Sequence, residues 1–260
     1  MYYIVIAGPA GSGKSYLTKA LSEWIVDHKM DVTKVNLDPA CDWLPYSPDV
    51  DVRNYVDARE VMGRYGLGPN GALLVSIDLL VNHISDIKAE IEAERSNYVI
   101  IDTPGQLELL AFRRSGPIVL NSIIGDSKAI TLFLIDSFLA LQPFSLISIL
   151  LYGAATLIQL GRPQLFVLSK ADNLSDEKKA ELLELFEHGA ESEVFNMYVD
   201  SRYVDYSLVS SLLEYVHSHA PPPIPVSSTK YEGLDELYAE IQRVLAGGED
   251  YLTEEPSEAL

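Results

Sequence analysis

Near its amino terminus the chain reads Gly8-Pro9-Ala10-Gly11-Ser12-Gly13-Lys14-Ser15. This stretch fits the pattern G-x-x-x-x-G-K-[S/T], and it lies between an apolar run at residues 2–7 and a helical pattern at residues 14–27. A strand, a glycine-rich turn and a helix in that order point several backbone N–H groups at one phosphate. The stretch therefore predicts a P-loop that binds a nucleoside triphosphate.

Within this loop, we expect the backbone and two side chains to hold the ligand. Lys14 is placed to reach the β- and γ-phosphates, and Ser15 is placed to bind Mg²⁺. The residues predicted to contact the nucleotide here are Gly11, Ser12, Gly13, Lys14, Ser15 and Tyr16.

Apolar runs of strand length recur along the chain and alternate with helical patterns. The runs lie at residues 2–7, 32–37, 98–101, 129–135, 165–168 and 224–226. They are continuous in hydrophobicity, which indicates parallel strands covered on both faces. The helical patterns include residues 14–27, 175–186 and 234–245, and a stripe at helical spacing formed by Ile77, Val81, Ile84, Ile87 and Ile91. This alternation predicts an α/β fold of the P-loop NTPase type with a doubly wound, mainly parallel sheet.

No linker divides the chain, so we expect residues 1–246 to form a single P-loop domain. Residues 39–55 are rich in Pro, Asp and Tyr and predict an ordered loop. A helical insertion is predicted before the last strand, at about residues 190–220, because no strand pattern occurs there. Residues 247–260 are acidic and short of apolar residues, which predicts a disordered tail.

The chain is strongly acidic, with 19 Lys and Arg against 38 Asp and Glu and a formal net charge of −19. This balance disfavours direct binding of nucleic acid, because phosphate backbones attract basic surfaces. Cys41 is the only cysteine, which excludes an intramolecular disulfide. The sequence begins with a strand pattern where a secretory leader would have a basic segment, so a cytoplasmic location is expected.

Residues 137–161 contain no charged residue, and their length approaches that of a transmembrane helix. Polar or helix-breaking residues, among them Gln142 and Gln159, lie near the ends of this segment, and predicted strands of the sheet lie on both sides of it. We therefore expect a helix that is buried in the core or at a subunit interface, and no membrane contact. A membrane helix is the alternative.

The motif DTPGQ at residues 102–106 directly follows an apolar run. An Asp at the end of such a strand is where a P-loop fold places its second metal-associated carboxylate, so Ser15 and Asp102 are predicted to hold Mg²⁺. Gly105 can bring a backbone N–H to the γ-phosphate. Gln106 is placed like the water-orienting glutamine of GTPases.

The motif SKAD at residues 169–172 also follows an apolar run, and it matches the guanine-reading pattern N/T/S-K-x-D. The Asp172 carboxylate can accept two hydrogen bonds from guanine N1 and the exocyclic amine, a donor pair that adenine lacks. The stem of Lys170 would lie across the base. After the last predicted strand, Ser227 and Ser228 are predicted to touch guanine O6 through backbone N–H groups.

Two further motifs are less conventional. GPNG at residues 68–71 predicts a turn, because Pro presets φ while Asn and Gly tolerate left-handed conformations. NLDPA at residues 36–40 ends the second predicted strand, so Asp38 would face the nucleotide edge of the sheet.

These motifs occur in this order together with LPY at residues 44–46 and DVR at residues 51–53, and the chain resembles the GPN-loop GTPases over residues 1–245. The resemblance implies a homodimer in which the Gly-Pro-Asn loop of one subunit, here Gly68, Pro69 and Asn70, reaches into the active site of the other. One difference is that Ser169 stands where the guanine motif commonly begins with Asn, which predicts looser packing of that loop.

The activity implied by the resemblance is Mg²⁺-dependent hydrolysis of GTP to GDP and phosphate. Asp38 is implied to take part in hydrolysis, and Gln106 and Glu108 meet the PGQxE pattern of the family, so these side chains would position or activate water. Asn70 of the other subunit would orient water or contact the γ-phosphate.

The biological role implied is that of a nucleotide-gated switch or assembly factor. Because eukaryotic members are associated with RNA polymerase biogenesis, a protein client of that kind is an expected partner. One alternative is an assembly chaperone in which hydrolysis only resets client binding. A P-loop kinase and a metal-insertion GTPase are further alternatives, which the acidic composition and the lack of a Cys/His cluster in the sequence disfavour.

Overall fold

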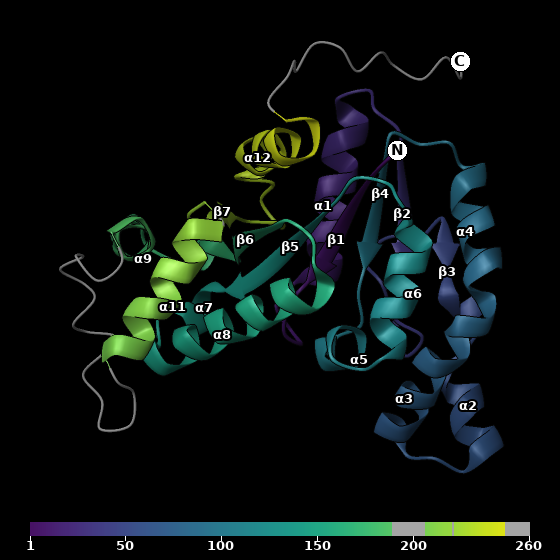
Figure 1. The fold of residues 1–260 in the computed structure, drawn as a ribbon. Helices are drawn as coiled ribbons and strands as arrows, with labels where there is room; N and C mark the ends of the chain where they lie inside the picture. The colour runs from purple at the N-terminus through teal and green to yellow at the C-terminus, as the bar shows by residue number, and fades with distance from the viewer. Residues whose placement is uncertain (189–205, 220, 248–260) are drawn as a thin grey trace.

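The computed structural model describes residues 1–188, 206–219 and 221–247 of the chain. At its centre lies a seven-stranded parallel sheet in the order β3-β2-β4-β1-β5-β6-β7 (Figure 1). The strands are β1 (Tyr2–Ala7), β2 (Val32–Asn36), β3 (Val50–Asp51), β4 (Tyr98–Asp102), β5 (Ala129–Asp136), β6 (Gln164–Ser169) and β7 (Ile224–Val226). Every predicted strand is present, and the α/β P-loop fold class is confirmed. The strand β3 was not predicted, because two residues are too few to form a pattern within the loop expected at 39–55.

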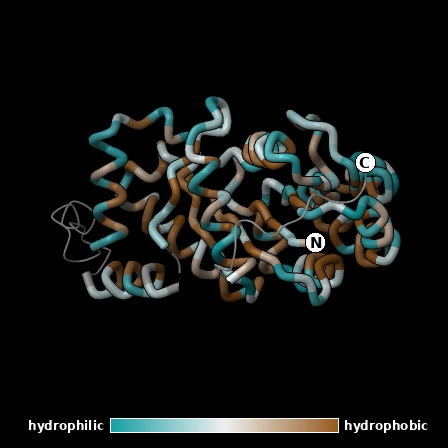
Figure 2. The backbone as a smooth tube through the Cα atoms, turned by 90° about the horizontal axis from the view of Figure 1, so that it is seen from above, coloured by the Kyte–Doolittle hydropathy of each residue, from teal (hydrophilic) through white to brown (hydrophobic). Residues whose placement is uncertain are grey.

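Helices cover both faces of the sheet. They are α1 (Lys14–Asp27), α2 (Ala58–Tyr65), α3 (Pro69–Leu80), α4 (Ile84–Ala93), α5 (Leu107–Ala111), α6 (Ser115–Ile124), α7 (Ser137–Ala140), α8 (Pro143–Leu160), α9 (Asp176–His188), α11 (Tyr206–His219) and α12 (Leu234–Ala246). One core cluster joins one face of the strands to α1 and α12, and a second cluster joins the opposite face to helices that include α3, α4, α6 and α8. Neighbouring residues such as Ile4 and Val5 belong to different clusters because strand side chains alternate between faces. Hydrophobic residues therefore follow the strands through the middle of the molecule (Figure 2).

The carboxyl ends of the parallel strands meet at one edge of the sheet. Asn36 is in register with Asp102, and Asp136 is in register with Ser169. The P-loop follows the end of β1, which pairs with both β4 and β5. Polar residues that lie far apart in the sequence are thus brought to the edge where α/β folds bind ligands.

The apolar stripe predicted for one helix is divided between two. α3 ends at Leu80, a 3₁₀ turn spans Val81–His83, and α4 begins at Ile84. The break occurs where the backbone of His83 leaves the helical region, with φ −111° and ψ 6°. Ile77 and Ile87 are buried on either side of the break, whereas Val81 within it is 37% exposed. The helical spacing of these apolar residues continues across the break because both helices pack against the same core.

The charge-free segment forms α7 and α8. Leu146 and Leu150 of α8 are buried in the core, whereas Phe144, Leu151 and Ile158 are exposed. Among the described residues, no helix is long and apolar enough to cross a membrane. The helical insertion predicted at about 190–220 is seen in part, as α11, while residues 189–205 and 220 and the predicted tail from residue 248 onward lie outside the described residues.

Candidate functional site

The P-loop joins β1 to α1 through residues that need glycine. Gly8 has a φ of 147°, and a Cβ there would lie 3.0 Å from both Leu134 O and Ser12 Oγ. Gly13 adopts a left-handed conformation at the amino-terminal cap of α1. Only residues without a side chain tolerate these positions at low cost, so the loop places its backbone around one point.

Lys14 is 6% exposed, and its ammonium group lies inside the loop. Nζ donates to Gly8 O at 2.9 Å and to Pro9 O at 3.0 Å. Burial lowers the pKa of Lys14, and the negative charges of Asp102 and Asp38 oppose that shift. The side chain therefore supplies a positive charge at the centre of the loop, held by carbonyls that phosphate oxygens can replace.

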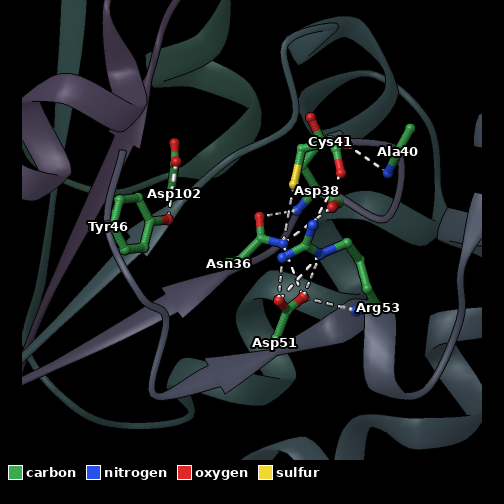
Figure 3. A network of polar contacts seen from close by, with 8 residues as sticks. All are labelled: Asn36, Asp38, Ala40, Cys41, Tyr46, Asp51, Arg53 and Asp102. Atoms are coloured by element: carbon green, nitrogen blue, oxygen red, sulfur yellow. Dashed lines mark hydrogen bonds and ion pairs between the residues drawn. The ribbon is translucent and has the colours of Figure 1, made fainter. Parts of the chain in front are cut away.

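Asp102 lies at the end of β4 and is 2% exposed. Oδ2 accepts a hydrogen bond from Tyr46 Oη at 3.0 Å, whereas Oδ1 is buried without a partner among the described residues. Figure 3 shows the Tyr46 ring directed at this carboxylate. Burial raises the pKa of Asp102 to about 6, and hydrogen bonds from Ser15 and Tyr46 and the charge of Lys14 limit the rise.

These groups fit a magnesium ion. A buried carboxylate oxygen without a partner is costly, and a cation would satisfy it. The hydroxyl of Ser15 lies within hydrogen-bonding reach of the same carboxyl group, so the predicted pair is brought together. Carboxylate and hydroxyl oxygens are hard ligands of the kind Mg²⁺ prefers.

Asp38 connects two loops at the edge of the sheet, and Figure 3 shows its contact with Ala40 in the first of them. Oδ1 accepts from Ala40 N at 2.9 Å, and Oδ2 accepts from Gly105 N at 3.3 Å. The N–H of Gly105, expected to face the γ-phosphate, is thus engaged by Asp38. Both residues line the same pocket as Lys14, so this contact lies beside the predicted phosphate position.

A network of polar side chains holds the backbone of the loop that carries Asp38 (Figure 3). Asn36 Nδ2 donates to Asp51 Oδ1 at 2.9 Å and to Asp38 O at 3.2 Å. Arg53 makes a two-pronged ion pair with Asp51 and donates from Nη1 to Cys41 O at 3.0 Å. Burial alone would raise the pKa of Asp51, but hydrogen bonds from Arg53 and Asn36 outweigh burial and keep it below its usual value.

The Gly-Pro-Asn segment begins a helix, whereas the sequence predicted a turn at residues 68–71. Gly68 caps α3, Pro69 is its first residue, and Asn70 lies in its first turn. The fixed φ of proline suits the first helical position, where no backbone N–H is needed. Asn70 is exposed, and its Oδ1 accepts from Nε2 of Gln106 in the same chain at 3.4 Å.

Gln106 and Glu108 lie at the start of α5, and both are exposed. The Glu108 carboxylate lies near Tyr152, where burial and the negative charge of Glu108 raise the pKa of the phenol. Of the residues predicted to be catalytic, only Asp38 lines the pocket that contains Lys14. Asn70 and Gln106 therefore contact each other outside the lining of that pocket. Glu108 is exposed and does not line the pocket either.

Two adjoining pockets form one continuous site. The first, of about 410 Å³, contains Lys14, Ser15, Asp38 and Asp102, and the exposed ring of Trp43 lies at its rim. The second, of about 330 Å³, contains predicted base-reading and P-loop residues. Those residues are Ser12, Asp172 and Ser228. Residues that line both pockets are Gly13, Tyr16 and Lys170.

The loop after β6 is tied to the P-loop. Ser169 Oγ donates to Ser12 O at 2.8 Å, and Lys170 Nζ donates to Gly11 O at 2.7 Å. The looser packing predicted for serine at position 169 is therefore not found, because its hydroxyl reaches a P-loop carbonyl directly.

The turn after β7 places one predicted serine differently. The backbone N–H of Ser227, predicted to face guanine O6, donates instead to Glu232 O at 3.0 Å. Ser227 is buried, and its Oγ accepts from Lys230 N at 3.2 Å, so it stabilises the turn. Ser228 lines the second pocket with Thr229, the next residue of the same predicted polar turn, and with Asn173, which the sequence did not single out.

Two comparisons with known proteins identify the family. A family model described as a conserved hypothetical ATP binding protein matches residues 6–247. GPN-loop GTPase 3 of Dictyostelium discoideum is 31% identical over 258 residues, which cover 97% of this chain and 90% of the relative. This chain belongs to the GPN-loop GTPase family. The resemblance drawn from the motifs is thereby confirmed.

A second curated GPN-loop GTPase and a solved structure of a GTPase are also similar to this chain. GPN-loop GTPase QQT2 of Arabidopsis thaliana is 31% identical over 253 residues, which cover 95% of this chain. The chain spans 64% of the length of that relative. A crystal structure described as a GTPase in apo form from Pyrococcus abyssi is 27% identical, with a TM-score of 0.77, and the match covers 94% of this chain and 97% of that one.

Proposed function

We propose that this GPN-loop family member hydrolyses GTP to GDP and phosphate with Mg²⁺, as a homodimer. The observation that carries the proposal is the continuous site, in which Asp172 lies at one end and Lys14, Ser15 and Asp102 lie at the other. A carboxylate at the base end favours guanine, because only guanine offers it two donors. This reasoning favours GTP over the ATP named in the family description.

At the phosphate end, the chain supplies charge and position. Lys14 would exchange its bonds to Gly8 and Pro9 for bonds to phosphate oxygens. Ser15 and Asp102 would hold Mg²⁺, which neutralises charge on the phosphate oxygens when it is bound. Because phosphoryl transfer demands mainly positioning and charge stabilisation, these groups account for binding and for part of catalysis.

Asp38 is the side chain best placed to act on the attacking water. Its carboxylate lines the phosphate pocket beside Gly105, and two backbone N–H groups fix its orientation. It would accept a hydrogen bond from the water and align the water with the γ-phosphorus. Gln106 directly follows Gly105, Glu108 lies two residues further on, and in this proposal a movement of α5 brings both to the same water.

The homodimer completes the site in this proposal. Asn70 and Gln106 are exposed and lie outside the pocket lining, so a second copy of the chain can cover them. Asn70 of the partner subunit would then donate to a phosphate oxygen or orient the water, as its amide can donate and accept at once.

The biological role we propose is a nucleotide-gated switch that binds a protein client, with RNA polymerase-related proteins as the expected class. An assembly chaperone in which hydrolysis only resets client binding is the second form of this role. The free thiol of Cys41 suits a reducing compartment, and we place the protein in the cytoplasm.

The test is phosphate release from GTP and from ATP, each with Mg²⁺ and with excess EDTA. We expect release from GTP that requires Mg²⁺, slow release from ATP, and a dimer in sedimentation. Equal or faster release from ATP would overturn the guanine assignment. Lys14→Ala is the control, since loss of its charge should abolish tight triphosphate binding and remove any signal that arises from this site.

A further inference from the structure

We propose that Asp136 is a positioning residue for the base end of the nucleotide site, acting through Lys170. The inference deepens the proposed function and rests on it. Asp136 ends β5, in register with Ser169 at the end of β6, so its side chain starts beside the loop that carries Lys170 and Asp172. The sequence offered a signal, since an Asp ends this apolar strand just as Asp102 ends β4.

The contact itself is an ion pair. Asp136 Oδ2 accepts from Lys170 Nζ at 2.6 Å, and the Asp136 side chain is 13% exposed. The same Nζ donates to Gly11 O at 2.7 Å. The ammonium of Lys170 is therefore fixed between the end of β5 and the P-loop, and charge-assisted bonds of this length are among the stronger ones in proteins.

The backbone of Lys170 is held from the same strand end. Lys170 has a φ of 56°, a left-handed conformation that costs a residue with a side chain free energy. Ser137, the neighbour of Asp136, donates from Oγ to Lys170 O at 2.8 Å. Adjacent residues of β5 and α7 thus hold both ends of Lys170, its carbonyl and its ammonium.

Fixing Lys170 shapes both pockets. Lys170 lines the base pocket and the phosphate pocket, and its Cε lies 3.9 Å from where a Cβ on Gly13 would be. Its stem is therefore packed along the P-loop, where it forms a surface for the flat face of a base. A lysine without the Asp136 counter-charge would sample more rotamers, and a ligand would have to order it on binding.

A purely structural role for Asp136 has to be separated from this one. Its other oxygen, Oδ1, accepts from Phe138 N at 2.9 Å and caps α7. The substitution Asp136→Asn separates the two roles, because the amide retains an oxygen for the cap but loses the charge that pairs with Lys170. Asp57→Asn is a matched control, since Asp57 caps α2 through a bond from Arg59 N at 2.7 Å.

The experiment is calorimetric titration of GDP, IDP and ADP into the wild type, Asp136→Asn, Lys170→Met and the double variant. We expect Asp136→Asn to weaken GDP binding about tenfold, in line with the loss of one charge-assisted bond. It should weaken IDP binding by the same factor, because Lys170 contacts the face of the base and reads no exocyclic group. In the double variant the affinity should equal that of Lys170→Met alone, because Asp136 acts through Lys170.

Each outcome decides one claim. If the wild type prefers GDP to ADP and Asp136→Asn binds GDP as the wild type does, the inference is wrong while the proposed function stands. If the wild type shows no preference for GDP, the proposed function fails, and a weaker affinity of Asp136→Asn for both nucleotides still supports the positioning role. Losses that add in the double variant assign Asp136 a role independent of Lys170 and overturn the inference. Should Asp136→Asn fold poorly, Asp136→Ser retains a capping oxygen and is read in the same way.

Discussion

Nε2 of Gln106 lies 3.4 Å from Oδ1 of Asn70 within one chain, so the amide of the Gly-Pro-Asn segment meets the side chain that follows Gly105. Asp78 of α3 also accepts from Arg113 Nε at 3.0 Å and from Ser115 Oγ at 2.6 Å. The helix that begins with the Gly-Pro-Asn segment is thereby joined to the region that follows Gln106 at two points.

Asn70→Ala should lower the rate of GTP hydrolysis while GDP affinity stays within about twofold of the wild type, because Asn70 lies outside the pocket lining. Single-turnover phosphate release and GDP titration measure the two quantities. Mixing Asn70→Ala with Lys14→Ala protein gives a sharper measurement. A mixed dimer has one site with an intact P-loop that receives an intact Asn70, so activity above either variant alone is expected once subunits exchange. Confirmed exchange without recovered activity would contradict a site shared between independent subunits.

Asp38→Ala should retain nucleotide binding and lose turnover, because Asp38 is proposed to act on the water in the transition state. A loss of at least about 100-fold in the single-turnover rate is expected for a water-positioning group. The comparison variant is Asp49→Ala, whose carboxylate accepts from Lys34 N in the same region of the sheet but does not line the phosphate pocket. Turnover by Asp38→Ala at the wild-type rate would remove Asp38 from the catalytic group.

Asp172→Asn should weaken GTP binding by about 2–3 kcal/mol, since a charged acceptor is replaced and a buried donor is mismatched. The loss should be smaller for ITP, which lacks the exocyclic amine that Asp172 is proposed to bind. Competition titrations with both nucleotides give the ratio. Equal losses for GTP and ITP would show that Asp172 does not read the amine.

The raised pKa of Asp102 makes stability depend on pH in the protein without nucleotide or Mg²⁺. Between about pH 4 and pH 6 the folded protein binds a proton that the unfolded chain has released, so the free energy of unfolding falls as pH rises through that window. Above pH 6 the charged, buried carboxylate remains a cost on the order of 2–3 kcal/mol.

Asp102→Asn should therefore stabilise the protein at pH 8 by an amount of that order, and the gain should vanish near pH 4. Denaturant unfolding at several pH values measures it, with the exposed Asp126→Asn as control. A gain that is the same at pH 4 and pH 8 would mean that the charge of Asp102 is not its source.

Helix α8 offers two adjacent leucines in opposite surroundings. Leu150 is 1% exposed and Leu151 is 42% exposed. Leu150→Ala should lower the free energy of unfolding by about 2–5 kcal/mol, as is usual for a core leucine. Leu151→Ala should change it by less than about 0.5 kcal/mol. Urea unfolding of a dilute sample compares them; a large loss for Leu151→Ala would place Leu151 in a subunit contact, which sedimentation would then show.

The sequence predicted those parts of the fold that depend on local pattern. The strand at Ile224–Val226 and the helix at Lys14–Asp27 were predicted with the bounds observed. The apolar run marks the strand, and the P-loop motif fixes where the helix begins. The Gly-Pro-Asn segment was assigned to a turn because Gly-Pro and Asn-Gly pairs suit turns, and the same proline suits the first position of a helix.

The parts of the site that the sequence missed depend on pairing between distant segments. Tyr46 meets Asp102, and Asp136 meets Lys170, across separations that no local pattern encodes. Ser227 is buried and bonded to Glu232 across the turn after β7, whereas its neighbour Ser228 lines the base pocket. Such contacts become visible only when the sheet brings the strand ends together.

The hydrogen bonds from Ser169 and Lys170 to the P-loop hold the base pocket and the phosphate pocket at a fixed spacing. Lys170 lines both pockets and is already held by Asp136 and Gly11, so neither half of the ligand has to order it on binding. Guanosine and a free phosphate chain should therefore bind almost independently of each other. A nucleotide that joins them should still bind far more tightly than either piece, because binding of one half holds the other half next to its own pocket.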